Sequence, residues 1–349
     1  MLFNLSKLKL VLQKKLPNIK GILRKFFRII PNVAIPIIIM PFIQKYFGAE
    51  NSSIAIVLVF ICMFKVEQIN TPKSYVKMSI LLIIIAILAS IASLNLVTSI
   101  ILNLVVPFFI IFLTTAEKKE SNYFIYGYEY IMLQSYPIHI IQIPQRIAAV
   151  IITLLLGYIF MRIYNRKKKI DKNLVCDGDL VLYNMKNFEK ILKRKNPRFR
   201  FAIRTSFILW ITCIFMDRIP DRNIRSYWLP LITYGCLEID YQKQQSKILA
   251  QMGGAVIGVA IFILIFHWIP TNALLVFMTI AFTILFTLKN DYLKKAVGTV
   301  LGMSFAISTF GEIGAIALRY FYVVLAIGIV AVFEYLRKIV RRIEHFLYL

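Results

Sequence analysis

The chain has 349 residues, of which 59% are hydrophobic and 17% charged, and its mean hydropathy is +0.72. A soluble domain of this composition would lack the polar surface needed to cover its core. The formal net charge is +25, but the basic residues fall between apolar runs, which favours a membrane protein over a nucleic-acid-binding one.

Twelve apolar segments follow one another along the chain. They lie near residues 29–43, 53–64, 78–93, 96–115, 123–136, 146–162, 201–216, 226–237, 248–268, 271–288, 293–310 and 314–334. Because a spanning helix needs about 20 apolar residues, we predict an all-α polytopic membrane protein with about twelve transmembrane helices. Segments 53–64 and 226–237 are too short to cross alone. Short spans at matching positions of two halves often mark a transporter binding site.

The two halves of the chain share the order of their charged residues. The pairs are Arg24 with Arg200, Arg28 with Arg204, Glu67 with Glu238, Lys73 with Lys243, Lys77 with Lys247, and Arg146 with Arg319, at offsets of 170 to 176 residues. Because each half holds six segments, we predict two parallel six-helix repeats.

This repeat predicts the domain organisation. We expect a basic amphipathic segment on the cytoplasmic face (1–28), the first repeat (29–164), a cytoplasmic linker (165–200), the second repeat (201–336) and a basic cytoplasmic tail (337–349). Basic residues at alternate ends of the segments place both termini in the cytoplasm, in a protein of the plasma membrane.

Three motifs of the second half are similar to those of a known family. They are Asn-Pro-Arg-Phe-Arg-Phe-Ala-Ile-Arg at 196–204, Tyr-Trp-Leu-Pro at 227–230, and a polar hairpin that leads from Asp240 to Gly254, with Gly258 one turn later. With these motifs, residues 196–335 resemble the fusaric acid resistance family, also called the aromatic acid exporter family. Residues 24–164 resemble it only through the repeat. Lys243 and Lys247 stand where arginines are commoner in the family, and Gly253-Gly254 replaces a Gly-Thr pair.

The resemblance implies an efflux carrier for aromatic and other hydrophobic carboxylic acids. Plant relatives form organic-anion channels, and relatives in bacteria with two membranes work with a periplasmic adaptor. We therefore expect a secondary, proton-coupled exporter of aromatic or amphipathic organic acids. A passive organic-anion channel and a non-transporting membrane assembly protein are the alternatives. The sequence leaves open whether an adaptor or a second copy in a dimer takes part.

Arginines within or beside apolar segments are the first candidates for binding a substrate carboxylate, because the guanidinium fork matches it. These are Arg146, Arg204 and Arg319, and Arg204 could instead extend to the lipid headgroups. Lys243 and Lys247 could guide an anion to the cytoplasmic mouth or act only as topology signals. Tyr227 and Trp228 could stack on an aromatic substrate or belong to the interfacial aromatic belt.

Acids beside the short segments are the candidates for proton coupling, because desolvation favours a protonated carboxyl group. Glu238, Asp240 and Glu67 fit this role, with pairing to nearby lysines as the alternative. The spacing of Gly254 with Gly258, and of Gly298 with Gly302, predicts helix-packing faces. The scattered cysteines and histidines predict no metal site and no cofactor, and the lack of clustered acids argues against an enzyme.

Overall fold

The computed structural model describes residues 26, 29–31, 33–60, 72–115, 123–165, 185–186, 196–217, 227–266 and 274–347. Over these ranges the regular structure is helical, which confirms the predicted all-α class. Seven helices in the described ranges are long and apolar enough to cross a membrane, so the chain is a multi-pass membrane protein. The predicted segment 1–28, most of the linker and Glu67 lie outside the described residues.

The first half begins with a helix at Ile29–Phe47. It continues through the short 3-10 helix η1 (Ala49–Asn51), α2 (Ile54–Phe60), α3 (Pro72–Ala92), α4 (Leu96–Thr114), α5 (Tyr123–Ser135), the 3-10 helix η3 (Ile140–Gln142) and α6 (Ile143–Asn165). The second half consists of α9 (Pro197–Asp217), α10 (Trp228–Cys236), α11 (Tyr241–Phe266), α12 (Leu274–Thr287) and α13 (Asp291–Leu347).

Seven of the about twelve expected crossings are helices of full membrane length in the described ranges. The other helices are shorter there, and α2, α5 and α12 each adjoin residues that the structure does not describe. Helices α2, α5, α10 and α12 have 7, 13, 9 and 14 residues. At 1.5 Å per residue, α10 is about 14 Å long, roughly half of a hydrocarbon core. The segment near 226–237, which the sequence marks as too short to cross alone, is a short helix; the segment near 53–64 is described only up to residue 60.

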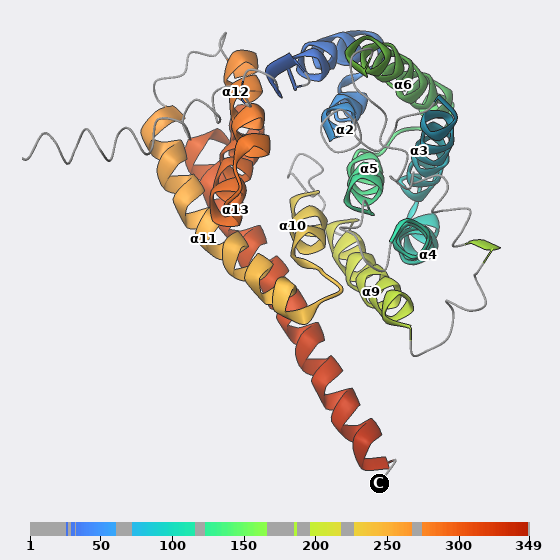
Figure 1. The fold of residues 1–349 in the computed structure, drawn as a ribbon, viewed down its shortest axis with the longest axis vertical. Coiled ribbons are helices and arrows are strands. Elements are labelled where there is room, and N and C mark those ends of the chain that lie inside the picture. The colour runs from blue at the N-terminus through green and yellow to red at the C-terminus, as the bar shows by residue number, and fades with distance from the viewer. Residues whose placement is uncertain are drawn as a thin grey trace, which may run out of the picture.

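Helix α13 reverses direction in its middle. Gly311 has a φ of 68° and a ψ of 180°, a conformation open to glycine because it has no Cβ. Arg319 Nη2 donates a hydrogen bond to Thr299 Oγ1, 20 residues earlier, so the two arms lie antiparallel. The second arm continues past the bundle to the C-terminal end (Figure 1), and the predicted basic tail is part of this helix.

Helix α10 lies at the junction of the two halves. It packs against α5 from the first half and against α9, α11 and α13 from the second (Figure 1). Helix α4 packs along α9, where Trp210 Nε1 donates a 2.8 Å hydrogen bond to the carbonyl of Ile100. The shortest helix of the second half is therefore held on all sides by other helices.

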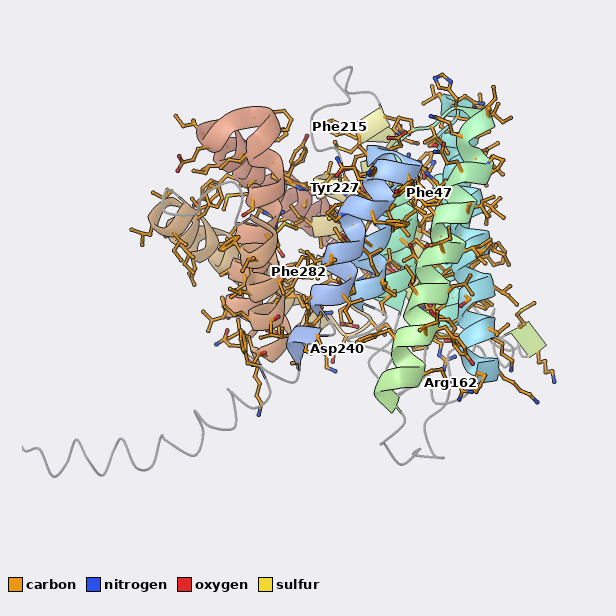
Figure 2. The ribbon with its side chains drawn as sticks, turned by 90° about the horizontal axis from the view of Figure 1, so that it is seen from above. Phe47, Arg162, Phe215, Tyr227, Asp240 and Phe282 are labelled. Carbon is orange, nitrogen blue, oxygen red and sulfur yellow. The ribbon has the colours of Figure 1, made fainter. Side chains whose placement is uncertain are left out.

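The ends of the helices fall at two opposite levels. Figure 2 shows Phe47 and Phe215 at one end of the bundle and Arg162 and Asp240 at the other. This arrangement agrees with the sequence, which assigns the ends near 47 and 215 to one side of the membrane and those near 162 and 240 to the opposite side.

Helix α11 packs closely on the first arm of α13 through glycines. A Cβ at Gly258 would lie 2.5 Å from the Ala296 carbonyl oxygen, and one at Gly254 would lie 2.4 Å from Lys295 Cβ. The predicted packing role of Gly298 has no such contact, since a Cβ there would meet nothing within 4 Å.

We expect Gly258→Ala to destabilise the protein by about 1–3 kcal/mol, because the added methyl group overpacks a backbone contact. Gly298→Ala is the matched control, with an unchanged or slightly higher stability, because alanine favours a helix. Thermal unfolding of both variants in detergent measures this difference. Equal melting temperatures would contradict the close packing of α11 on α13.

Candidate functional site

Arg319 on the second arm of α13 is a buried arginine without a carboxylate partner among the residues that the structure describes. Its side chain is largely enclosed, with the residue 8% exposed. Its Cζ lies 5.3 Å from the ring centroid of Trp228, and its bond to Thr299 Oγ1 is 3.3 Å long. Its Nε is buried and has no hydrogen-bond partner in the described chain. A guanidinium has five N–H donors, so most of them stay available to a ligand.

The same guanidinium lies over the side chain of the residue that begins α10. Trp228 is the first residue of this helix, and the capping residue Tyr227 gives it no side-chain hydrogen bond. The first N–H groups of a helix lack partners within it and carry a partial positive charge. In α10 these are the N–H groups of Trp228 and Leu229, because Pro230 has none and Leu231 N donates to the Tyr227 carbonyl. A cation beside this end is disfavoured, whereas an anion between the two would be stabilised by both. We call this group of Arg319, Trp228, Thr299 and the start of α10 the Arg319 site.

Aromatic rings continue from the Arg319 site toward α5. The ring centroids of Trp228 and Tyr322 are 6.2 Å apart, those of Tyr227 and Trp228 are 6.5 Å apart, and those of Tyr136 and Tyr227 are 5.8 Å apart. Gly302 adjoins the site, since a Cβ there would lie 3.4 Å from Arg319 Nη1 and 3.8 Å from Trp228 Cζ2. The predicted aromatic pair Tyr227 and Trp228 is thus buried beside an arginine.

A second cation lies at the opposite end of α10. Lys295, one helical turn before Thr299, has its Nζ 3.2 Å from the position of a Cβ on Gly235. The C-terminal end of a helix carries a partial negative charge that favours a lysine. Lys295 therefore has a local electrostatic reason for its position that Arg319 lacks.

Arg204 is held by an acid of its own chain. Its Nη1 lies 2.7 Å from Glu334 Oε1, and its Nη2 donates to the carbonyl of Glu238. Glu334 also pairs with Arg337 at 2.9 Å and accepts a 3.0 Å hydrogen bond from Gln244. This network joins α9, α11 and α13, so a substrate carboxylate at Arg204 would have to displace Glu334.

Arg146 is fully buried and makes hydrogen bonds along its whole guanidinium group. It donates to Asn51 Oδ1 at 2.8 Å, to the Leu133 carbonyl at 2.8 Å and to the Tyr136 carbonyl at 2.6 Å. These bonds tie η1 and the end of α5 to the start of α6. The geometry is that of a structural cross-link, with no carboxylate needed to satisfy the arginine.

Two of the three predicted coupling acids, Glu238 and Asp240, lie between α10 and α11, and Lys243 and Lys247 lie in the first turns of α11. Glu238 pairs with Lys247 at 2.6 Å. Asp240 is exposed and caps α11, since its Oδ1 accepts a 2.9 Å hydrogen bond from the backbone N of Gln242. Lys243 is exposed. Their arrangement satisfies the charges locally, and a coupling role for these acids stays a prediction.

Glu129 in α5 is an acid that the sequence reasoning missed. It is 1% exposed, and its Oε2 has no hydrogen-bond partner within the described part of the chain. The available signal was a single acid inside an otherwise apolar and tyrosine-rich segment, Tyr123–Ser135. An ionisable residue in a membrane segment is a candidate functional residue by default.

Comparison with protein families supports the resemblance seen in the sequence. Residues 206–333 match the family described as fusaric acid resistance protein-like, which confirms the resemblance for most of the second half. The match includes Trp228, Thr299 and Arg319, and it leaves out Arg204 and Glu334. No curated protein and no solved structure matches the chain. The family match indicates a membrane transport protein.

Arg146 and Arg319 should respond differently to replacement by glutamine. Arg146→Gln leaves buried carbonyl groups of Leu133 and Tyr136 without donors, and each such loss costs about 1–3 kcal/mol. Arg319→Gln removes the hydrogen bond to Thr299, so we expect a smaller loss of stability. Melting temperatures of the purified variants test this order. An Arg319→Gln protein that is less stable than Arg146→Gln would show that Arg319 is mainly structural.

Proposed function

We propose that the chain exports small organic anions across the membrane, and that Arg319 binds their carboxylate group. The observation that carries this proposal is the buried guanidinium of Arg319, which has no acidic partner in the described chain and lies against the start of α10. A buried charge without a partner is costly. A ligand of opposite charge that binds beside the buried charge would offset part of this free-energy cost.

The short length of α10 supports this role. Discontinuous helices inside transporters often direct their N-terminal ends at an anionic group of the substrate. Here the end of such a helix and an arginine converge, so a carboxylate could accept hydrogen bonds from both. The guanidinium carbon lies 5.3 Å from the centroid of the indole ring, and the planar fork of N–H groups at its edge matches a carboxylate.

The row of aromatic rings supports an aromatic or amphipathic substrate. Tyr136, Tyr227, Trp228 and Tyr322 offer ring faces beside the cation. Offset or edge-to-face contacts with a substrate ring add about 0.5–1.5 kcal/mol each beyond the area that they bury. Lys295 and Lys243 would raise the local anion concentration on the way to Arg319.

Paired packing supports the two-repeat arrangement that the sequence predicts. Helix α2 packs on α6 as α10 packs on α13, and α3 packs on α5 and α6 as α11 packs on α13. Repeats of 29–164 and 201–336, with 165–200 as the linker, would let the two halves rock against each other around a site at their junction. We also propose that the end near Asp240 and Arg162 faces the cytoplasm.

Arg319→Gln should lower the transport of an aromatic carboxylate at least tenfold, because the cation is lost. Arg319→Lys keeps the charge but loses the bidentate fork, so we expect an intermediate loss. The measurement is uptake of labelled p-aminohippurate by proteoliposomes that hold equal amounts of folded protein. Arg162→Lys, at the exposed end of α6, is the matched control.

Wild-type flux in this assay also separates the alternatives. Saturable exchange of p-aminohippurate supports a carrier, and a voltage-driven anion current without exchange supports a channel on the same site. Arg319→Gln with wild-type flux would refute the proposed site. No flux above protein-free liposomes would leave the assembly protein as the better hypothesis.

The proposed orientation is tested with single cysteines in a cysteine-free background. Gln44→Cys and Lys243→Cys lie at exposed positions near opposite ends of the bundle. We expect a membrane-impermeant maleimide to label Gln44→Cys in intact cells and Lys243→Cys only after permeabilisation. The reverse pattern would invert the topology.

A further inference from the structure

Glu129 differs from the other buried acid of the described helices in its surroundings. Glu334, with 7% of the residue exposed, is bound by Arg204 and Arg337. Glu129 is more deeply buried and forms no ion pair or hydrogen bond with any residue that the structure describes. A carboxyl group that stabilised the fold would be expected to have a donor.

No charged group on the neighbouring helices compensates Glu129. The other titratable residues of α5 are Tyr123, Tyr126, Tyr128 and Tyr130, and α2 and α4 carry none. On the neighbouring elements of the first half they are Lys73, Tyr75 and Lys77 of α3, Arg146 at the start of α6, and Lys45 and Tyr46 of the first helix. On those of the second half they are Arg198, Arg200, Arg204, Cys213 and Asp217 of α9, and Tyr234 and Cys236 of α10. None of them forms an ion pair with Glu129 in the described chain. Arg146 and Arg204 are held by Asn51 and Glu334.

The environment therefore tolerates the neutral acid and penalises the carboxylate. An ionised group in an apolar interior is stable only when a partner or water reaches it. If α5 moves so that water reaches Glu129, the group can release its proton. Burial then requires that a proton is bound again.

Helix α5 is mechanically joined to the Arg319 site through α10. A Cβ on Gly127 would lie 2.3 Å from the Tyr234 ring, and Phe124 stacks on Tyr234 with ring centroids 5.7 Å apart. Tyr136 reaches Tyr227 beside Trp228. Packing this close does not let α10 shift on anion binding without moving α5.

We propose that Glu129 is the proton-binding residue that couples anion movement to a proton gradient. This inference rests on the proposed function and assigns coupling to a residue of the first half, outside the residues that match the family. One proton bound at Glu129 would cross inward in exchange for one carboxylate that leaves from Arg319. Glu238 and Asp240, which are ion-paired and exposed respectively, would serve as local counter-charges.

The test uses the full chain in proteoliposomes with labelled p-aminohippurate as the probe. Glu129→Gln keeps the shape of the side chain and removes the proton site. We expect it to lose accumulation driven by a pH gradient at least tenfold, while counterflow exchange at equal pH stays within about twofold of wild type. Glu312→Gln, an exposed acid at the turn of α13, is the matched control and should leave both unchanged.

The outcomes separate this inference from the proposed function. Absence of wild-type counterflow refutes the proposed function, and the inference falls with it. Wild-type counterflow together with a normal gradient response in Glu129→Gln refutes the inference alone, as does wild-type flux that ignores the gradient.

Infrared spectroscopy supplies a readout that does not depend on transport. Purified wild-type protein should show the carbonyl band of a protonated carboxylic acid at neutral pH. The band should disappear in Glu129→Gln and remain in Glu312→Gln. A spectrum in which Glu129→Gln retains the wild-type band would overturn the assignment.

Discussion

The burial of the Arg319 guanidinium against Trp228 is the constraint on which the rest of the second half depends. A cation at this depth needs aromatic stacking and a polar contact when no anion is bound, and Trp228 and Thr299 provide them. The contact with Thr299 requires the chain to reverse at Gly311, so that the two arms of α13 face each other. The contact with Trp228 requires α10 to begin beside Arg319. Close glycine packing of α11 on α13 then holds the hairpin in place.

The buried charges of the described helices divide into those with partners and those without. Arg146 bonds to carbonyl groups, and Arg204 with Glu334 forms an ion pair that joins three helices. A buried ion pair is weak evidence that the pair stabilises the fold. Removing one partner would nevertheless destabilise the protein, because the other charge would stay buried without compensation. Arg319 and Glu129 lack such pairs, and they lie on helices that both pack against α10. Arg319 and Glu129 each lack an ion-pair partner in the described chain, and α10 contacts both of their helices. This arrangement fits a transporter that binds an anion at one residue and a proton at the other.

Much of this arrangement could be predicted from the sequence, and the exceptions have physical causes. The apolar runs predict the helical class, and the short apolar runs predict the positions of α2 and α10. The position of Arg319 inside an apolar run marked it as a candidate.

The partner of Arg204 could not be predicted because Glu334 lies 130 residues away. The hydrogen bonds of Arg146 end on backbone carbonyls, which carry no sequence signal. Glu129 could not be predicted from charges at helix ends, because it is a single acid between tyrosines in the middle of α5. Gly298 and Gly302 share the spacing of Gly254 and Gly258, but spacing alone does not say which face meets another helix.

The most direct test of the central claim measures binding at Arg319 itself. The chain has three tryptophans, so Trp210→Phe with Trp268→Phe leaves Trp228 as the single fluorophore beside the guanidinium. Titration with benzoate should change its fluorescence in a saturable way, and benzamide, the neutral analogue of the same shape, should not. The change should disappear when Arg319 is replaced by glutamine. An equal response to benzamide, or an unaltered response without Arg319, would contradict a carboxylate site at this arginine.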